Sequence, residues 1–481
     1  MSGQVLRPYQ EHSLEELRAG FAAGHRRQVL VVPTGGGKTT IASKMIEATV
    51  ARNPRPNAVL FQAHRKELIE QCSQRLDENG ITAHGVVMAG HPRRRPFAPV
   101  QVASVDTLAH RKPLDPPPLL VIADECHRTL GARQTRIIRD LYPDAYVVGL
   151  TATPWRLDRK GLGAYDEDGE AQLFSRMVVG ATYSQLIADG FIMEPSVLCP
   201  WIPDLSGVSV TSDGEYNEAE LSEICDTPQT IRDVVNWWHK SANGARSVAF
   251  ANSIEHSRRL VDAFVAAGVR AAHLDGMTDP AERTGILARL AAHELDVVSN
   301  YGVLGEGWDL PACEVCVLTR PTTSLALYMQ MVGRVLRPAY SAGKRRALVM
   351  DFAGASYRHG WPTADRAWTL ADRPKNPRRK AGADDDCDAP PVSICPACLY
   401  ARPSSEAGQA CPNCGHVAAA APKKPIDTER VSGVPMVEVT REAVEAASRP
   451  VSFARRAFGA PPKQRAQGYS PGSYDAGRWK R

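Results

Sequence analysis

The chain has 481 residues, of which 43% are hydrophobic, and its formal net charge is +5. This length allows two or three domains, and no apolar run approaches the roughly 18 residues of a membrane span. Residues 1–10 lack the basic and apolar segments of a secretory signal. We therefore expect a cytoplasmic protein whose eleven cysteines serve as thiols or metal ligands rather than as disulfides.

The first motif is Arg7-Pro8-Tyr9-Gln10, which precedes a helical pattern of apolar residues. The Gln10 side chain has both a donor and an acceptor, which suits the edge of an adenine base. Taken alone, a glutamine on the protein surface is the simpler interpretation.

A phosphate loop is predicted next, because an apolar run at 29–32 leads into three glycines, a lysine and a helical pattern from Ile41 to Val50. Consecutive glycines let backbone N–H groups surround a phosphate, and the following helix presents its positive end to the same anion. The strict motif has glycine where this chain has Val32, and an ordinary glycine-rich turn would not need the Lys-Thr pair. We expect Lys38 to reach the β- and γ-phosphates and Thr39 to hold Mg²⁺. The predicted nucleotide-binding residues of this loop are Thr34, Gly35, Gly36, Gly37, Lys38, Thr39 and Thr40.

Further apolar runs alternate with helical patterns, which predicts a parallel sheet covered on both faces. The expected strands are 58–61, 100–105, 119–123 and 146–150. Asp124 and Glu125 follow one of them, at the strand ends where such sheets bind ligands. Asp124 suits a hard cation held by phosphates, and Glu125 suits the orientation and deprotonation of an attacking water. An isolated Asp-Glu pair is more often a solvated loop, but its position downstream of a phosphate loop favours function.

A second α/β block begins near Ala245 and has no phosphate loop of its own. Its expected strands are 247–250, 269–273, 295–299, 315–318 and 347–350. A helix expected from Leu325 to Arg337 carries Gln330 and Arg334 as well. Two arginines one turn apart, with no carboxylates nearby in sequence, can reach toward a phosphate on another domain. The alternative is a pair of surface salt bridges.

In order and in spacing, these segments resemble the motif series of superfamily 2 helicases from about Arg7 to Asp351. RPYQ resembles the Q motif and PTGGGKTT motif I, while FQAHRKEL and VASVDTL are similar to motifs Ia and Ib. DECH and LTATP resemble motifs II and III, and VAFANS, VVSNYGVLGEGWDLP and QMVGRVLR resemble motifs IV, V and VI. The match is closer to the DExH branch with DNA repair, restriction and phage recombination helicases than to the DEAD-box RNA group.

The resemblance implies an α/β fold of two tandem RecA-like lobes, each a parallel sheet flanked by helices, with ATP and Mg²⁺ in the cleft. It assigns the nucleotide chemistry to Lys38, Thr39, Asp124 and Glu125, and it implies that His127 couples the site to motif III. The second lobe would contribute Gln330, Arg334 and Arg337, with Gly307 and Asp309 near the ribose. Nucleic acid would contact His64, Arg65, Ser104–Thr107, Asn252 and Ser299.

Composition divides the remainder of the chain. We expect a first lobe at 1–198, an interlobe linker at 199–240, a second lobe at 241–356, a flexible linker at 357–391, a zinc ribbon at 392–418 and a basic, disordered tail at 419–481. Trp237 and Trp238 of the interlobe linker could stack on bases, but a helix packed against a lobe is the simpler interpretation.

Two CxxC pairs, Cys395 with Cys398 and Cys411 with Cys414, can supply four thiolates to a structural Zn²⁺. A redox dithiol would not need two pairs. Cys313 and Cys316 share the spacing but lie on an apolar strand, so we expect them in the core.

The charge is uneven, because residues 421–481 hold 12 basic and 6 acidic side chains. A basic tail can bind nucleic acid or a protein partner, yet disorder explains it equally well. The sequence therefore predicts an ATP-dependent helicase or translocase, acting on DNA, without a membrane partner. The alternatives are an RNA helicase, the motor subunit of a restriction-type complex, and an ATP-switched DNA-binding adaptor.

Overall fold

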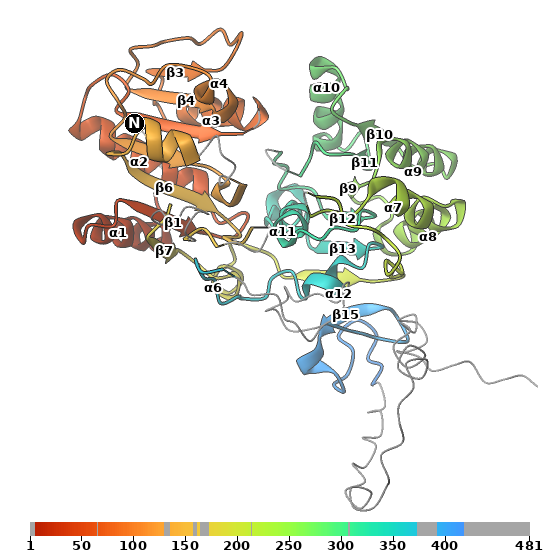
Figure 1. Ribbon diagram of the computed structural model, residues 1–481. Coiled ribbons are helices and arrows are strands. Elements are labelled where there is room, and N and C mark those ends of the chain that lie inside the picture. Colours follow the sequence, from red (N-terminus) through yellow and green to blue (C-terminus); the bar gives the residue numbers. More distant parts are fainter. Residues whose placement is uncertain are drawn as a thin grey trace, which may run out of the picture. The chain divides into compact units, whose positions relative to one another are not determined.

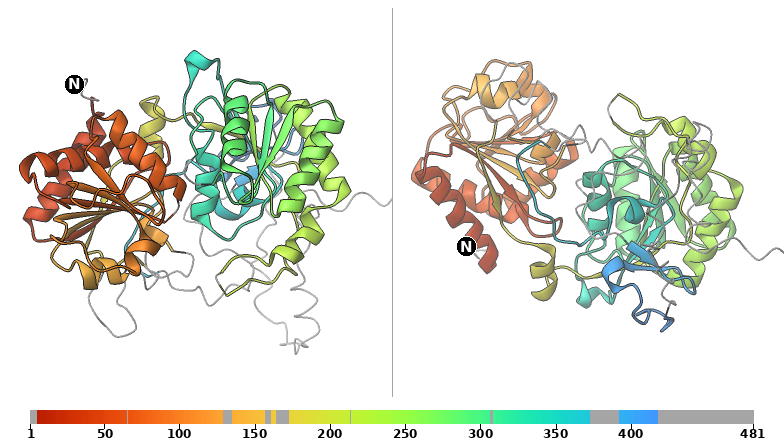
Figure 2. Two further views of the ribbon diagram at one scale, coloured as in Figure 1. Left: turned by 90° about the horizontal axis from the view of Figure 1, so that it is seen from above. Right: turned by 60° about the horizontal axis from the view of Figure 1, so that its bottom comes forward.

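Two β-sheets, each with helices on both faces, form the framework of the protein (Figures 1 and 2). The computed structural model describes residues 5–64, 66–128, 135–156, 161–163, 173–212, 214–305, 308–372 and 392–417. These residues belong to one compact unit that ends at Ala421. None of the helices in these ranges is both long enough and apolar enough to cross a bilayer.

The first sheet is parallel throughout, in the order β3-β4-β2-β5-β6-β1-β7. Its strands are β1 (Arg27–Val31), β2 (Val59–Ala63), β3 (His84–Val87), β4 (Val100–Ser104), β5 (Leu120–Ala123), β6 (Tyr146–Thr151) and β7 (Arg176–Val179). The helices of this lobe are α1 (Pro8–Ala22), α2 (Lys38–Arg52), α3 (Lys66–Glu78), α4 (Val105–Ala109) and α6 (Tyr183–Ala188), with single turns at Cys126–Arg128 and Ile137–Leu141.

Both faces of this sheet are buried, which explains its continuous apolar runs. Leu30 of β1 and Phe61 of β2 enter one apolar core, whereas Val29 and Leu60 enter a second core. Successive side chains of a strand point to opposite faces, so each strand needs apolar residues at every position when helices cover both sides.

The second sheet has the order β10-β11-β9-β12-β13-β8-β15-β14, parallel from β10 to β8 and antiparallel at β15 and β14. Its strands are β8 (Pro195–Leu198), β9 (Ser247–Phe250), β10 (Ala271–Leu274), β11 (Val297–Asn300), β12 (Val315–Leu318), β13 (Ala347–Asp351), β14 (Val392–Ile394) and β15 (Tyr400–Pro403). The helices are α7 (Glu218–Cys225), α8 (Pro228–Ala242), α9 (Ile254–Ala266), α10 (Pro280–Ala291), α11 (Leu325–Gly333) and α12 (Ala355–His359), with single turns at Tyr340–Ala342 and Ser404–Glu406.

The segments between and after the lobes are more ordered than their composition indicates. Strand β8, placed in the first lobe by sequence, pairs with β13 of the second sheet. Helix α8, placed in the interlobe linker, packs on α9, and Trp238 donates to Ser247 Oγ at 2.8 Å. Trp238 is therefore a core residue, as the simpler interpretation predicted, with 1% of its surface exposed.

The expected flexible linker at 357–391 is also partly packed. Residues 373–391 lie outside the described ranges, but those before them return to the first lobe. The Trp155 and Trp368 rings meet edge to face with centroids 4.4 Å apart, and the N–H of Gly163 donates to the Leu370 carbonyl at 2.9 Å. Apolar tryptophans in a charged, proline-rich stretch thus mark contact with a lobe rather than a free linker.

Helix α11 is shorter than predicted, because it ends at Gly333 and not at Arg337. The last turn tightens, since the N–H of Val335 donates to the carbonyl of Val332 three residues earlier. A Cβ on Gly333 would lie 2.4 Å from Cγ2 of Thr34, so only glycine allows this close approach to the phosphate loop. Arg334 and Arg337 consequently do not share one helical face.

Candidate functional site

The phosphate loop follows β1, and its backbone has the geometry that an anion requires. Gly35 and Gly37 have φ values of +88° and +80°, in the left-handed region that favours glycine. Gly37 caps α2, which begins at Lys38, so the helix presents its free N–H groups and positive dipole end to the loop. Thr39 and Thr40 lie in the first turn of that helix. Val32, the departure from the strict motif, is fully buried, and its Cγ1 would be 2.5 Å from a Cβ on Gly36. These features fit the phosphates of a nucleotide.

The Q-like motif at the start of α1 contacts this loop through the carbonyl of Gly36. Gln10 is 3% exposed, so the surface interpretation is wrong. Its Oε1 accepts the N–H of Arg7 at 3.0 Å, and its Nε2 lies 3.4 Å from the Gly36 carbonyl. Tyr9, which sequence reasoning passed over, donates its hydroxyl to the same carbonyl at 2.6 Å. Burial raises the pKa of Tyr9 and keeps it a donor. The position of Tyr9 next to Gln10 in the motif is the sequence feature that could have predicted its contact with the loop.

The acidic motif after β5 is connected to the motif after β6 by a histidine. These strands are neighbours in the sheet, so their carboxyl ends lie together. Nδ1 of His127 is 2.9 Å from Thr151 Oγ1 and 3.4 Å from Oε2 of Glu125. Thr151 donates its single hydroxyl proton to the carbonyl of Thr153, so the Nδ1 of His127 is the donor to Thr151. The arrangement makes one hydrogen-bonded path between the two motifs.

Glu125 has an uncommon backbone conformation for a residue with a side chain. Its φ is +47°, and its N–H donates to Oδ1 of Asp124 at 3.1 Å. Non-glycine residues in this region store strain and cluster at functional sites. Glu125 lies two residues beyond the end of β5, and 14% of its side chain is exposed.

Second-lobe residues reach the phosphate loop directly. Cγ of Arg337 lies 3.5 Å from the position of a Cβ on Gly35. The guanidinium of Arg337 donates to Oδ2 of Asp309, and Arg75 of the first lobe is 3.7 Å from the same oxygen. Asp309, expected near a ribose, therefore lies between an arginine of each lobe.

The other two second-lobe residues have different surroundings. Arg334 does not point freely into solvent, because its guanidinium donates to the backbone carbonyls of Trp308 and Gly305, the latter at 2.6 Å. Gln330 is 4% exposed, and within the described part of the chain its Nε2 has no hydrogen-bond partner. A buried amide without a partner is costly, which makes Gln330 a donor available to a ligand.

Both lobes match known protein families. A family model described as type III restriction enzyme, res subunit, matches residues 4–156, and one described as helicase conserved C-terminal domain matches 226–339. A 51.5 kDa protein of a Lactococcus phage is 29% identical over 385 residues, which are 80% of this chain and 76% of the phage protein. A Schizosaccharomyces pombe protein named as a mitochondrial ATP-dependent helicase, irc3, is 30% identical over 367 residues. The chain belongs to the superfamily 2 helicases.

Solved structures support the fold of this helicase. The ATP-dependent type ISP restriction-modification enzyme LlaBIII bound to DNA is similar over 72% of this chain, with 19% identity and a TM-score of 0.52. Two tandem RecA-like lobes, as predicted, are confirmed. The alignment with the irc3 protein covers 73% of this chain and 58% of that protein. The alignment with LlaBIII covers 27% of LlaBIII.

Two of the helicase residues expected at the sites, Gly307 and Arg65, lie outside the described residues. Another residue at the nucleotide loop was missed by sequence reasoning. Tyr183, the first residue of α6, lies beside Thr34, and burial raises its pKa to about 12. Nothing in the local sequence distinguishes it from an ordinary core tyrosine.

The residues expected to contact nucleic acid are mostly buried. Ser299 is completely buried, and its hydroxyl lies 2.7 Å from Ser257 Oγ. The prediction that Ser299 contacts nucleic acid is therefore wrong. Asn252 is 2% exposed and hydrogen-bonds with His256. Ser104 is the N-cap of α4, where its Oγ accepts the N–H of Thr107. Among the described residues of this group, Asp106 is exposed, and His64 and Thr107 are partly exposed.

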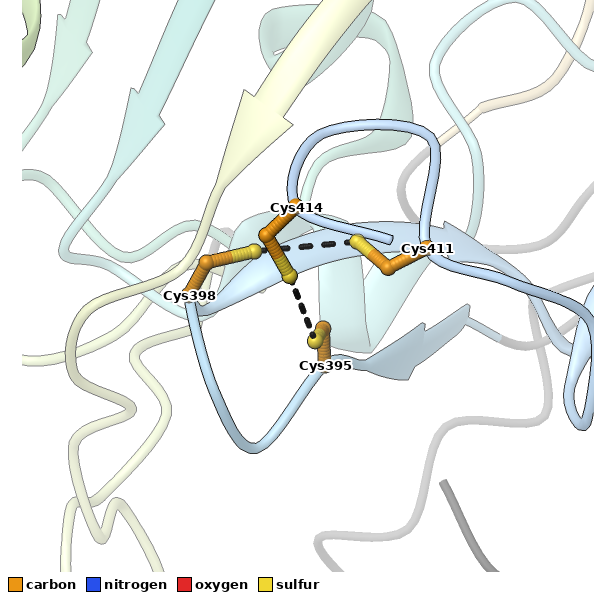
Figure 3. Close-up of side chains that lie close together, drawn as sticks. All are labelled: Cys395, Cys398, Cys411 and Cys414. Carbon is orange, nitrogen blue, oxygen red and sulfur yellow. Dashed lines mark hydrogen bonds between the residues drawn. The ribbon is translucent and has the colours of Figure 1, made fainter. Parts of the chain in front are cut away.

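The four cysteines of the ribbon converge in space (Figure 3). The sulfur atoms of Cys395 and Cys414 are 3.7 Å apart, and those of Cys398 and Cys411 are 3.6 Å apart. A disulfide requires about 2.05 Å, whereas four sulfurs at ~2.3 Å from one zinc ion lie roughly 3.8 Å from each other. The geometry fits a tetrahedral zinc site. Cys313 and Cys316 are fully buried, as predicted.

Proposed function

We propose that this helicase couples ATP hydrolysis to movement along DNA, with unwinding as its product on duplex substrates. The observation that carries the proposal is the contact of Arg337 with the phosphate loop, because it joins the second lobe to the nucleotide of the first. In RecA-like motors such an arginine stabilises charge on the γ-phosphate during transfer.

The phosphate loop and the acidic motif of the first lobe have different roles in binding and hydrolysing ATP. The backbone N–H groups at Gly35–Gly37 hold phosphate oxygens, and the Lys38 ammonium neutralises the β- and γ-phosphates. Thr39 and Asp124 would hold a bound Mg²⁺, whose positive charge would offset the negative charge of the phosphates. Glu125 accepts the proton of the attacking water.

The second lobe senses the γ-phosphate by exchanging partners. Arg337 leaves the carboxylate of Asp309 when phosphate oxygens offer a bidentate alternative, and the unpaired Nε2 donor of Gln330 serves the same group. After hydrolysis that differential contact is lost, so the equilibrium between closed and open lobes shifts back. The hydrogen bond from His127 to Thr151 links the acidic motif to the motif after β6 within the first lobe.

DNA is favoured as the track by the relatives, since one matching family is a restriction enzyme subunit and LlaBIII was solved bound to DNA. The decisive measurement is ATP turnover with single-stranded DNA, duplex DNA, forked DNA and RNA, beside strand-displacement assays. Stimulation by RNA alone would identify an RNA helicase. Stimulation by DNA without displacement would identify a translocating motor subunit, and DNA binding without stimulation an ATP-switched adaptor.

The accessory elements complete the proposal. The ribbon binds one structural zinc ion through Cys395, Cys398, Cys411 and Cys414. The basic tail at 419–481, outside the described residues, adds affinity for DNA or a protein partner, and the cytoplasmic location expected from the sequence stays a prediction.

A further inference from the structure

A lysine is completely buried behind the arginine of the second lobe. Lys344 follows the turn at Tyr340–Ala342, and none of its surface is exposed. Its ammonium donates to the carbonyls of Val335 at 2.7 Å, Arg337 at 2.8 Å and Pro311 at 3.1 Å. An ammonium has three donors and no acceptor, so all of its hydrogens are used.

These three carbonyls belong to two loops that carry functional side chains. Pro311 comes two residues after Asp309, while Val335 and Arg337 follow the end of α11. One ammonium thus fixes the backbone on both sides of the Arg337–Asp309 pair. No neutral side chain of similar length could satisfy three acceptors in this space, and an unsatisfied buried carbonyl is costly.

We propose that Lys344 is a positioning residue for ATP hydrolysis, which holds the backbone of Arg337 so that its guanidinium reaches the γ-phosphate. The inference rests on the proposed function, because it requires Arg337 to act on the nucleotide. Displacement of a catalytic group by about 1 Å can cost about 10²-fold in rate, so a backbone anchor at this position controls turnover.

The ammonium is held in an environment that makes its charge depend on pH. Burial lowers the pKa of Lys344 from 10.5 to about 8, Arg337 and Arg246 act in the same direction, and Cys313 and Glu314 oppose them. Above that pKa a neutral amine has two hydrogens and a lone pair, so one of the three carbonyls loses its donor. Turnover should then fall as the pH rises through about 8.

Stability should change in the opposite sense. The unfolded chain keeps the ordinary lysine pKa of 10.5, so it binds more protons than the folded chain between about pH 8 and 10.5. This group therefore makes the fold more stable as the pH rises through that window. A fall in kcat without a fall in melting temperature separates positioning from general unfolding.

The first test replaces Lys344 with methionine in the full-length chain, beside the control Arg345→Met, whose exposed side chain donates to Tyr340. We expect Lys344→Met to lower kcat by about 10²-fold while the dissociation constant for ATP stays nearly unchanged. Arg345→Met should match the parent. Normal kcat in a folded Lys344→Met variant would overturn the proposal, and so would a weakened ATP affinity with normal kcat.

The second test uses Arg337→Ala to separate this inference from the function beneath it. If Lys344 acts through Arg337, adding Lys344→Met to Arg337→Ala should lower kcat little further. Fully additive losses would show that Lys344 acts elsewhere. Normal turnover by Arg337→Ala would refute the proposed role of Arg337 in ATP hydrolysis itself. Should Lys344→Met not fold, the pH profile of the parent decides: a flat kcat from pH 7 to 9.5 contradicts the inference.

Discussion

Arg337 donates a hydrogen bond to the carboxylate of Asp309 while the stem of the same arginine lies against Gly35 of the phosphate loop. Both side chains are about one-third exposed. A γ-phosphate held at the loop and the carboxylate of Asp309 therefore compete for one guanidinium. A bound nucleotide must therefore displace the Asp309 carboxylate from Arg337.

This competition predicts that Asp309→Asn strengthens productive ATP binding. Removing the carboxylate charge frees Arg337, and a partly exposed ion pair contributes at most about 1 kcal/mol, so KM for ATP should fall about two- to fivefold. Steady-state ATPase assays measure this, with the exposed Asp262→Asn on α9 as the control. A higher KM would indicate instead that Asp309 contacts the nucleotide, as the family resemblance implies.

Arg337→Ala should abolish most hydrolysis while nucleotide binding persists. An arginine finger contributes about 10³-fold or more to turnover, whereas Lys38 and the glycine backbone hold ATP without it. Arg334→Ala should behave differently, because Arg334 bonds the carbonyls of Gly305 and Trp308 and its loss should also lower the melting temperature. Nucleotide affinity, turnover and melting should be measured on the same sample. Intact hydrolysis combined with lost DNA binding in Arg337→Ala would place that residue on the nucleic-acid face.

The sequence predicted the central strands well, because a parallel sheet buried on both faces imposes uninterrupted apolar runs such as Leu120–Ala123. It also located the glycine loop and the acidic motif, whose chemistry is local. It did not predict the partner of Arg337, because Asp309 lies 28 residues away and only the folded loops bring them together.

The same limit applies to Lys344 and to the ribbon. A lysine between two apolar segments is normally exposed, and nothing local indicates that three carbonyls of distant loops surround it. The pairing of β15 with β8 joins residues about 200 positions apart, so no periodicity records it. Likewise, no local pattern records that Gly333, the last residue of α11, lies against Thr34 of the other lobe.

Lys38→Ala should remove ATP hydrolysis without unfolding the protein. Lys38 is only partly buried, and its ammonium lies 3.4 Å from the Val32 carbonyl, a weak contact whose loss costs little. Malachite-green or coupled ATPase assays, with thermal melting as the check on folding, measure the outcome. The control is Lys44→Ala on the same helix, which loses a partly exposed pair with Glu47. Undiminished turnover in folded Lys38→Ala would remove the phosphate loop from the mechanism.

Glu125→Gln should bind ATP but fail to turn it over, because the amide cannot accept the proton of the attacking water. Asp124, which is proposed to hold the metal, is unchanged. The variant should therefore accumulate a closed, DNA-bound state, visible as slower DNA dissociation when ATP is present. A matched control is Glu47→Gln on α2. Normal ATPase activity in Glu125→Gln would assign the base to another residue.

The last prediction concerns the ribbon, which is part of the second sheet rather than a free module. Strand β15 pairs with β8, and the N–H of Cys199 donates to the Leu399 carbonyl at 3.0 Å. A chain ending near Asp386 lacks the ribbon but keeps the site residues of both lobes, so it should keep basal ATPase activity. The truncation should also lower the stability of the fold, because it leaves β8 as an open edge with unpaired backbone groups.

We expect about one equivalent of zinc in the full-length protein and none in the truncated chain or in Cys411→Ser. Both should melt at a lower temperature, since metal binding at a preorganised site is coupled to folding. The control Cys72→Ser alters a buried thiol outside the ribbon and should keep its zinc. Metal analysis and thermal unfolding test this together. Zinc that persists in the truncated chain would place its ligands elsewhere, and an unchanged melting temperature would show that β8 does not need β15.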